Sequence, residues 1–254
     1  MATQKHYVVF SVLLLINAFL AFLTFALGLQ EQAMAGQPLP ASLASTPGWV
    51  LGLANAALIV VLYGLLGVAG LWFSHKLSLP GVFREHAGWR AWVLTPMLWG
   101  VCVGAIMVGA DRFFAAKGGV GGLPHPGFPM SLLASATAGI GEEIVFRTFV
   151  MGLWAFLLNL LFKRWGATSA ALWGGNVIAA LAFGAAHLPA VMFLAGVQSP
   201  LALSPWVLAE IFVLNGVVAL VAGDRYIHDG LVAAVGVHFW ADVVWYVIWP
   251  LIAA

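Results

Sequence analysis

Charged side chains are scarce in this sequence. Of its 254 residues only 7% are charged and 63% are hydrophobic, whereas a soluble globular protein carries about 25% charged and about 45–50% apolar residues. So few charges cannot cover a water-facing surface, which excludes a soluble domain, a nucleic-acid-binding protein and a disordered chain. The net charge of +1 suggests no acidic or basic partner. The composition therefore predicts an integral membrane protein embedded in a lipid bilayer.

Cysteine is also nearly absent. Cys102 is the sole cysteine and lies in an apolar run, so an intrachain disulfide framework is impossible. No repeat, linker or shift of composition divides the sequence. We therefore expect one integral membrane domain over residues 1–254.

Long apolar runs predict an all-α protein, a polytopic transmembrane bundle of seven or eight helices, since each span needs about 20 apolar residues. The runs cover residues 7–29, 49–73, 91–114, 130–162, 169–188, 205–222 and 231–251. As one helix the fourth run would be about 50 Å long, more than the hydrocarbon core of about 30 Å. It must tilt, protrude or break into two helices, which gives the eighth.

Local signals predict whether the first helix is retained and where two later helices end. The first run is longer than the apolar region of a signal peptide, which is about 7–15 residues. We therefore expect a retained helix despite the small residues Ala33-Met34-Ala35. Pro189 predicts the end of the fifth helix, and residues 223–230 predict a turn after the sixth.

Basic residues near the span ends predict the orientation in the membrane. With a cytoplasmic N-terminus and seven spans, Arg112 and Lys117 lie outside, and the inner set is Lys5, Lys76, Arg84, Arg90, Lys163, Arg164 and Arg225. We expect the inner membrane of a prokaryote. This topology places Glu142 nearer the outer half and His238 nearer the inner half, so a shared site requires tilted or broken helices around a cavity.

Several ionisable residues lie inside the predicted spans, where a charge costs about 2.5–3.5 kcal/mol and usually faces a cavity or a partner. These residues are Glu142, Glu143, Arg147, His187, Glu210, His238 and Asp242. Charges at span ends, such as Asp111-Arg112, Asp224-Arg225 and Asp229, are expected to be solvated. For Glu210 we favour an interhelical hydrogen bond over catalysis.

Glu142, Glu143 and Arg147 form the densest charged cluster. Glu143 and Arg147 share a helix face at i, i+4 and can neutralise each other. Glu142 is turned away by about 100° and has no intrahelical cation. A carboxylate in low dielectric beside a second carboxylate holds a proton more readily, which suits a general base near neutral pH. A buried ion-pair network that locks two helices explains the cluster equally well.

Histidines come from two further spans. His187 lies near a helix end, where a satisfied interfacial histidine is the ordinary interpretation. His238 and Asp242 share a face at i, i+4, so they can bond each other or a common ligand. Together, three spans supply the Glu, His and Asp groups that water activation and oxyanion stabilisation require.

These motifs occur in a fixed order along hydrophobic helices. Glu-Glu-x-x-x-Arg spans residues 142–147, Phe-x-x-x-His spans 183–187 and His-x-x-x-Asp spans 238–242. This order and spacing resemble the CPBP family, which comprises type II CAAX prenyl endopeptidases and bacteriocin-processing or abortive-infection proteins. The resemblance covers about residues 130–246, the part of the chain expected to carry the catalytic core.

The resemblance implies an intramembrane endopeptidase of the glutamic type, without a cofactor. It implies that Glu142 activates the hydrolytic water and that His187 positions or polarises it. It also implies that His238 and Asp242 form the oxyanion site. The substrate would be a membrane-associated or lipidated peptide, such as a prenylated CAAX tail, a leader peptide or a C-terminal sorting signal.

The same resemblance assigns supporting roles and reveals two departures. Glu143 and Arg147 would hold the helix geometry, with Phe183 beside the site. Asp242 stands where the eukaryotic-type prenyl proteases have Asn, and an ionised Asp only accepts hydrogen bonds. We therefore expect Asp242 to orient His238. Thr148 stands where a small Gly commonly follows the Arg.

Other functions stay open from the residues alone. Glu142, His187 and His238 are a possible zinc ligand set, although the sequence has no His-Glu-x-x-His motif. The polar network could be purely structural, in a membrane scaffold or immunity-type protein. A transporter could use Glu142 and Asp242 as proton relays. The loop over residues 118–129 is expected to be a plain connector, with a gate as the alternative.

Overall fold

Helices make up the ordered elements of the protein, and the computed structural model describes residues 4–29, 43, 45–120 and 125–253. The helices are α1 (Gln4–Ala26), α4 (Gly48–Lys76), η1 (Arg90–Leu94), α5 (Thr95–Ala115), α6 (Met130–Glu143), η2 (Ile144–Met151), α7 (Gly152–Phe162), η3 (Lys163–Trp165), α8 (Thr168–Leu194), η4 (Pro200–Ala202), α9 (Pro205–Asp229), α10 (Leu231–Asp242), η5 (Val243–Ile248) and α11 (Trp249–Ala253). Those residues contain no strand, so the all-α prediction is confirmed. The residues Ala33-Met34-Ala35 lie outside the described ranges.

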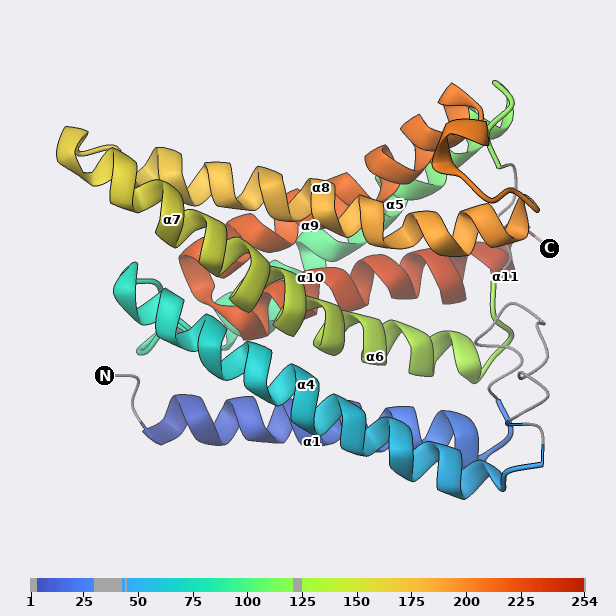
Figure 1. Ribbon diagram of the computed structural model, residues 1–254, viewed down its shortest axis with the longest axis horizontal. Helices are drawn as coiled ribbons and strands as arrows, with labels where there is room; N and C mark the ends of the chain where they lie inside the picture. Colours follow the sequence, from blue (N-terminus) through green and yellow to red (C-terminus); the bar gives the residue numbers. More distant parts are fainter. Residues whose placement is uncertain (1–3, 30–42, 44, 121–124, 254) are drawn as a thin grey trace.

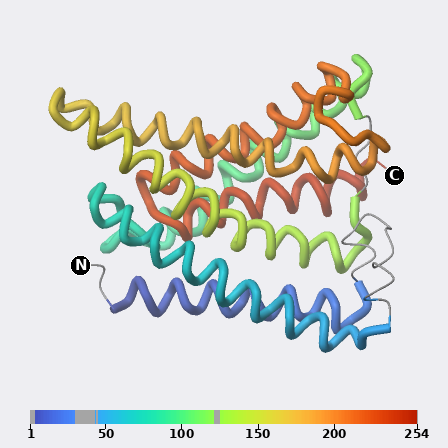
Figure 2. The backbone as a smooth tube through the Cα atoms, viewed as in Figure 1, coloured from blue at the N-terminus to red at the C-terminus, as the bar shows by residue number. Residues whose placement is uncertain are grey.

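Within the residues that the structure describes, seven helices are long and apolar enough to cross a membrane. Consecutive spans run in opposite directions between the two ends of the bundle (Figures 1 and 2). We call the side where α1 begins the N-terminal end. The stretch from α6 through η3 is one continuous span of 36 residues. It crosses the bundle obliquely and protrudes at the N-terminal end (Figure 1). Tilt and protrusion therefore accommodate its excess length, without an eighth span.

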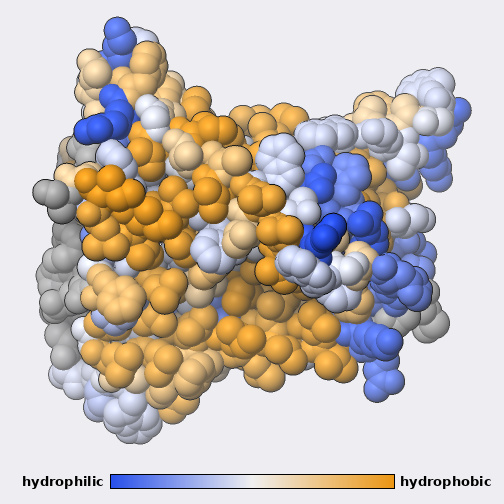
Figure 3. All heavy atoms as spheres, turned by 180° about the vertical axis from the view of Figure 1, so that it is seen from behind, coloured by the Kyte–Doolittle hydropathy of each residue, from blue (hydrophilic) through white to orange (hydrophobic). Residues whose placement is uncertain are grey.

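The outer surface is apolar, as expected for helices in lipid. Leu58, Val61, Leu65 and Trp72 on α4 are all exposed, at the spacing of one helix face. Seen from behind, hydrophobic residues cover most of the surface, and hydrophilic residues gather toward the N-terminal end (Figure 3). Large exposed apolar surfaces of this kind mark membrane contact. The chain is an integral membrane protein.

Two predicted helix ends are wrong. Pro189 lies inside α8, which continues to Leu194; membrane helices tolerate proline because neighbouring groups satisfy the freed backbone. Gly223 lies inside α9, which continues to Asp229. Its missing side chain serves packing, since an added Cβ would collide with Asn176 of α8. The break falls at Gly230, whose φ of +95° favours glycine.

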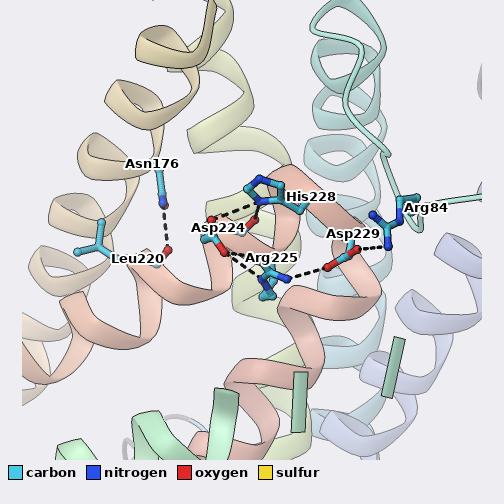
Figure 4. Close-up of polar contacts among 7 residues, drawn as sticks. All are labelled: Arg84, Asn176, Leu220, Asp224, Arg225, His228 and Asp229. Atoms are coloured by element: carbon cyan, nitrogen blue, oxygen red, sulfur yellow. Dashed lines mark hydrogen bonds and ion pairs between the residues drawn. The ribbon is translucent and has the colours of Figure 1, made fainter. Parts of the chain in front are cut away.

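A polar network closes the N-terminal end of the bundle (Figure 4). Arg225 pairs with Asp224 at 2.6 Å and with Asp229 at 3.1 Å, and Arg84 reaches Asp229 at 3.2 Å. The Leu231 N–H donates to the Gly81 carbonyl at 2.9 Å, which satisfies a donor at the start of α10. The prediction of a solvated Asp229 is therefore wrong, because this carboxylate is buried between two arginines.

Close helix packing also explains the unexpected Thr148. Its side chain is fully buried in η2 and its hydroxyl donates to the Ile144 carbonyl. Gly70 of α4 lies directly against Thr148, so closely that a Cβ on Gly70 would collide with it. Small residues let membrane helices approach in this way. The room for Thr148 thus comes from the glycine on the neighbouring helix.

Candidate active site

A cavity of about 580 Å³ lies among α6, α8, α9 and the C-terminal helix. Four predicted catalytic residues line it, namely Glu142, His187, His238 and Asp242, together with Phe183. A cavity of this size is within the range of small-ligand and active sites. The side chains that sequence patterns placed on three different spans therefore face one common cavity.

Glu142 and His238 are neighbours in the cavity. The Glu142 Oε2 atom lies 3.8 Å from His238 Nε2, and the Glu142 side chain keeps 33% of its surface exposed to the cavity. Glu142 lies about 18 Å along α6 from Met130, at the usual rise of a helix. The tilted span thus brings the two residues to one depth, which removes the conflict that a strictly upright topology predicts.

His238 is held by Glu143. Its Nδ1 lies 2.8 Å from Glu143 Oε1, and because a carboxylate accepts, Nδ1 donates this hydrogen bond. Asp242 lies 3.6 Å from the other ring nitrogen, Nε2, beyond hydrogen-bonding distance. Glu143 therefore holds one side of the ring, and Nε2 faces the carboxyl groups of Glu142 and Asp242. The role of Asp242 in orienting His238 stays a prediction.

Glu143 is itself anchored by Arg147. Both side chains are fully buried, and Arg147 Nε lies 3.1 Å from Glu143 Oε2. Arg147 Nη1 also donates to the Ala219 carbonyl of α9 at 3.0 Å. Buried charges are tolerated only when they are paired and hydrogen-bonded in this manner. The pair therefore fixes the carboxylate that holds His238 and ties this span to α9.

Phe183 separates the two histidines. Its ring meets His238 edge-to-face at 5.6 Å and His187 at 4.8 Å, and the guanidinium of Arg147 lies over it at 5.7 Å. His187 Nδ1 bonds the Phe183 carbonyl at 2.8 Å. A carbonyl only accepts, so Nδ1 carries the hydrogen, and Nε2 of the neutral ring is an acceptor. His187 thus lies in the same cavity without joining the carboxylate cluster around His238.

Comparison with known families matches residues 124–244 to the model of the type II CAAX prenyl endopeptidase Rce1-like family. The match covers slightly less than half of the chain, and this segment is similar to the family. The matched segment includes every residue predicted for the site. No curated protein and no solved structure matched the chain. The similarity supports a membrane protease of the CAAX type in general.

A second carboxyl pair lies nearer the other end of the cavity, away from the N-terminal end. Glu210 accepts from the Val120 N–H at 2.7 Å, and its carboxyl group interacts electrostatically with Asp111 of α5. Val120 lies in the connection after α5, so the interhelical hydrogen bond of Glu210 stays a prediction. The prediction of a solvated Asp111 is wrong, since Asp111 is buried. The sequence could not predict that Asp111 and Glu210 lie close together, because they belong to helices far apart in the chain.

The loop before α6 also contributes to the cavity. His125, Pro126 and Gly127 line it, and the His125 ring packs edge-on against Trp245 at 5.0 Å. Burial lowers the pKa of His125, and the nearby Asp111 carboxylate opposes that shift. The described part of the loop is therefore a wall of the site and more than a plain connector; Gly121, Gly122 and Pro124 lie outside the described residues.

The same side chains are also possible metal ligands by residue type. Within the described residues, no group of three or more His, Cys, Asp or Glu side chains is arranged to hold a metal ion. Of the possible zinc set, Glu142 and His238 are neighbours, but the ring contacts of His187 are with Phe183. The three residues thus share a cavity without forming a common ligand cluster.

Proposed function

We propose that this protein is an intramembrane endopeptidase that hydrolyses a peptide bond near the C-terminus or leader of a membrane-associated or lipidated substrate. One observation carries the proposal: a cavity-facing Glu142 lies 3.8 Å from His238, and His238 is fixed by a buried ion pair. A purely structural network has no need of a carboxylate directed into a cavity. The similarity of residues 124–244 to the type II CAAX prenyl endopeptidase family supports the same reaction class.

In the proposed reaction Glu142 is the general base. Its carboxylate takes a proton from a water molecule while the water oxygen attacks the scissile carbonyl carbon. The C–N bond of the tetrahedral intermediate then breaks, and Glu142 returns its proton to the leaving amine. His187 Nε2, an acceptor in the neutral ring, positions the attacking water. Atoms and protons balance without a cofactor.

The developing oxyanion would be stabilised by His238. Since Nδ1 already donates to Glu143, a donor role for Nε2 requires the doubly protonated ring. Asp242, 3.6 Å from Nε2, would stabilise that positive charge when ionised and donate to the oxyanion when protonated. Donors held in a site that excludes water act strongly on such charge.

The proposal is tested by comparing protein termini in membranes of cells that carry the wild-type chain or the Glu142→Gln variant. We expect new termini in one or a few membrane-associated proteins, present only with the wild-type chain. These products would identify the substrate. Identical termini in the two strains, at equal levels of the two proteins, would contradict the proposal.

Chelation tests the metal alternative. We expect the purified protein to cleave its substrate at an unchanged rate after treatment with a strong chelator, because the ring contacts of His187 separate it from Glu142 and His238. The measurement is the cleavage rate with and without chelator, together with metal content by elemental analysis. Loss of activity that added zinc restores would support the metal-dependent mechanism instead.

A further inference from the structure

The two ends of the bundle differ in charge. Because the helices alternate in direction (Figure 2), span ends and connections can be assigned to one side or the other. The N-terminal end carries Lys5, Lys76, Arg84, Arg90, Lys163, Arg164 and Arg225, and the opposite end carries Arg112 and Lys117. Loops rich in Lys and Arg stay in the cytoplasm. This asymmetry indicates that the N-terminal end lies on the cytoplasmic side.

The N-terminal end is also tightly packed beneath the candidate site. Val82, Tyr226 and Leu231 are fully buried there and belong to the largest hydrophobic cluster. Tyr226 is hydrogen-bonded to Ser74, and the Arg84–Asp229 pair ties the connection after α4 to the end of α9 (Figure 4). Among the described residues, a smaller pocket at this end, lined by His6 and Glu85, shares no residue with the catalytic cavity.

The cavity instead extends toward the opposite end. Its deepest wall is formed by Val218 and His238, and its outer wall by Val120, Pro126 and Leu194. Val120 and Pro126 belong to the connection between α5 and α6, and Leu194 is the last residue of α8. Both positions lie at the end away from the basic residues. Every described loop residue that lines the cavity comes from this end.

From these three observations we propose that the catalytic cavity opens toward the non-cytoplasmic side of the membrane. Its substrate is then a membrane-anchored polypeptide whose cleaved segment lies on that side. The statement about the substrate rests on the proposed function. The direction of the opening can be measured without any activity. It narrows the substrate to one side of the membrane.

The depth of the cavity sets the form of that segment. Glu142 lies about 18 Å along α6 from its first residue, and an extended chain covers about 3.3–3.6 Å per residue. About five extended residues must therefore enter before the scissile bond reaches Glu142. Apolar side chains such as Leu194, Leu214 and Trp245 line the path. The segment is thus an unfolded, largely apolar tail or an unwound helix end.

Cysteine accessibility tests the direction of the opening. The sole cysteine is replaced by Cys102→Ala, and single cysteines are added as Ala190→Cys in the cavity, Lys117→Cys at the far end and Lys163→Cys at the N-terminal end. Each variant is treated with a charged, membrane-impermeant maleimide in bacterial spheroplasts and in inverted membrane vesicles. The same set is made with Glu142→Gln, so that labelling is measured independently of cleavage.

We expect Lys117→Cys and Ala190→Cys to be labelled at least ten-fold faster in spheroplasts than in inverted vesicles, and Lys163→Cys to show the reverse. Labelling of Ala190→Cys only in inverted vesicles would overturn the inference, as would its failure to react from either side. Exchange of the two end markers would overturn the orientation. An inactive protein with the expected labelling would contradict the proposed function and leave the direction of the opening established.

Discussion

Replacing Glu142 by Gln removes cleavage and leaves a folded protein in the membrane. Gln has nearly the same size but cannot take a proton from water, and general-base catalysis contributes about 10²–10⁴-fold to a rate. The fold is retained because Glu142 is partly exposed to the cavity and belongs to no fully buried ion pair. The measurement is the cleavage rate of the purified variant on the substrate identified from cellular termini.

Glu210→Gln is the matched control for this experiment. Glu210 is a second carboxyl group that lines the same cavity, but it interacts with Val120 and Asp111 and not with His238. The Gln carbonyl can still accept from Val120, and its amide can donate to Asp111. We expect this variant to cleave within about three-fold of the wild-type rate, well inside the loss for a general base. Full cleavage by purified Glu142→Gln would refute the mechanism and favour a structural or transport role for Glu142.

Replacing Arg147 by Met destabilises the whole protein. The change leaves Glu143 fully buried without its cation, and removal of one partner from a buried pair costs about 3–5 kcal/mol. It also removes the hydrogen bond to the Ala219 carbonyl. The measurement is thermal unfolding in detergent together with the folded fraction after extraction, and both are expected to fall.

The double variant Glu143→Gln/Arg147→Met is the informative comparison. With both charges removed, no unpaired charge is left in the core, so we expect stability well above that of Arg147→Met alone. The Gln carbonyl can still accept from His238 Nδ1. Unfolding of Arg147→Met at the wild-type temperature would show that the buried pair does not hold the site together.

Apolar runs and the spacing of rare charges predicted most of the fold and the centre of the site. Helical period placed Glu143 and Arg147 together, and their ion pair is present at 3.1 Å. Residues such as Glu142 and His238 could be singled out because a bilayer makes each buried charge costly. The few charged residues inside the apolar runs therefore predicted where the polar centre of the site lies.

Contacts between distant helices could not be obtained in the same way. Glu143 and Asp242 are both plausible partners of His238, and only the tilt of α6 decides for Glu143. Asp111 and Glu210 lie on helices whose pairing leaves no local pattern in either segment. Gly223 is a residue typical of turns, yet it lies inside α9, where its missing side chain leaves room for Asn176 of α8.

The wide-turned η2 segment directly after Glu143 has a consequence for the span as a whole. A π-helical turn carries one residue more than an α-helical turn, which offsets everything beyond it by about 100°. Side chains in α7 are therefore rotated about the helix axis relative to the pattern that α6 sets up to Glu143. Gly152 can lie against Phe73 and Ala155 against Gly175 only while that offset is kept. The number of residues in η2, more than their identity, therefore sets the angle between the face of α6 that carries Glu142 and the face of α7 that packs on its neighbours.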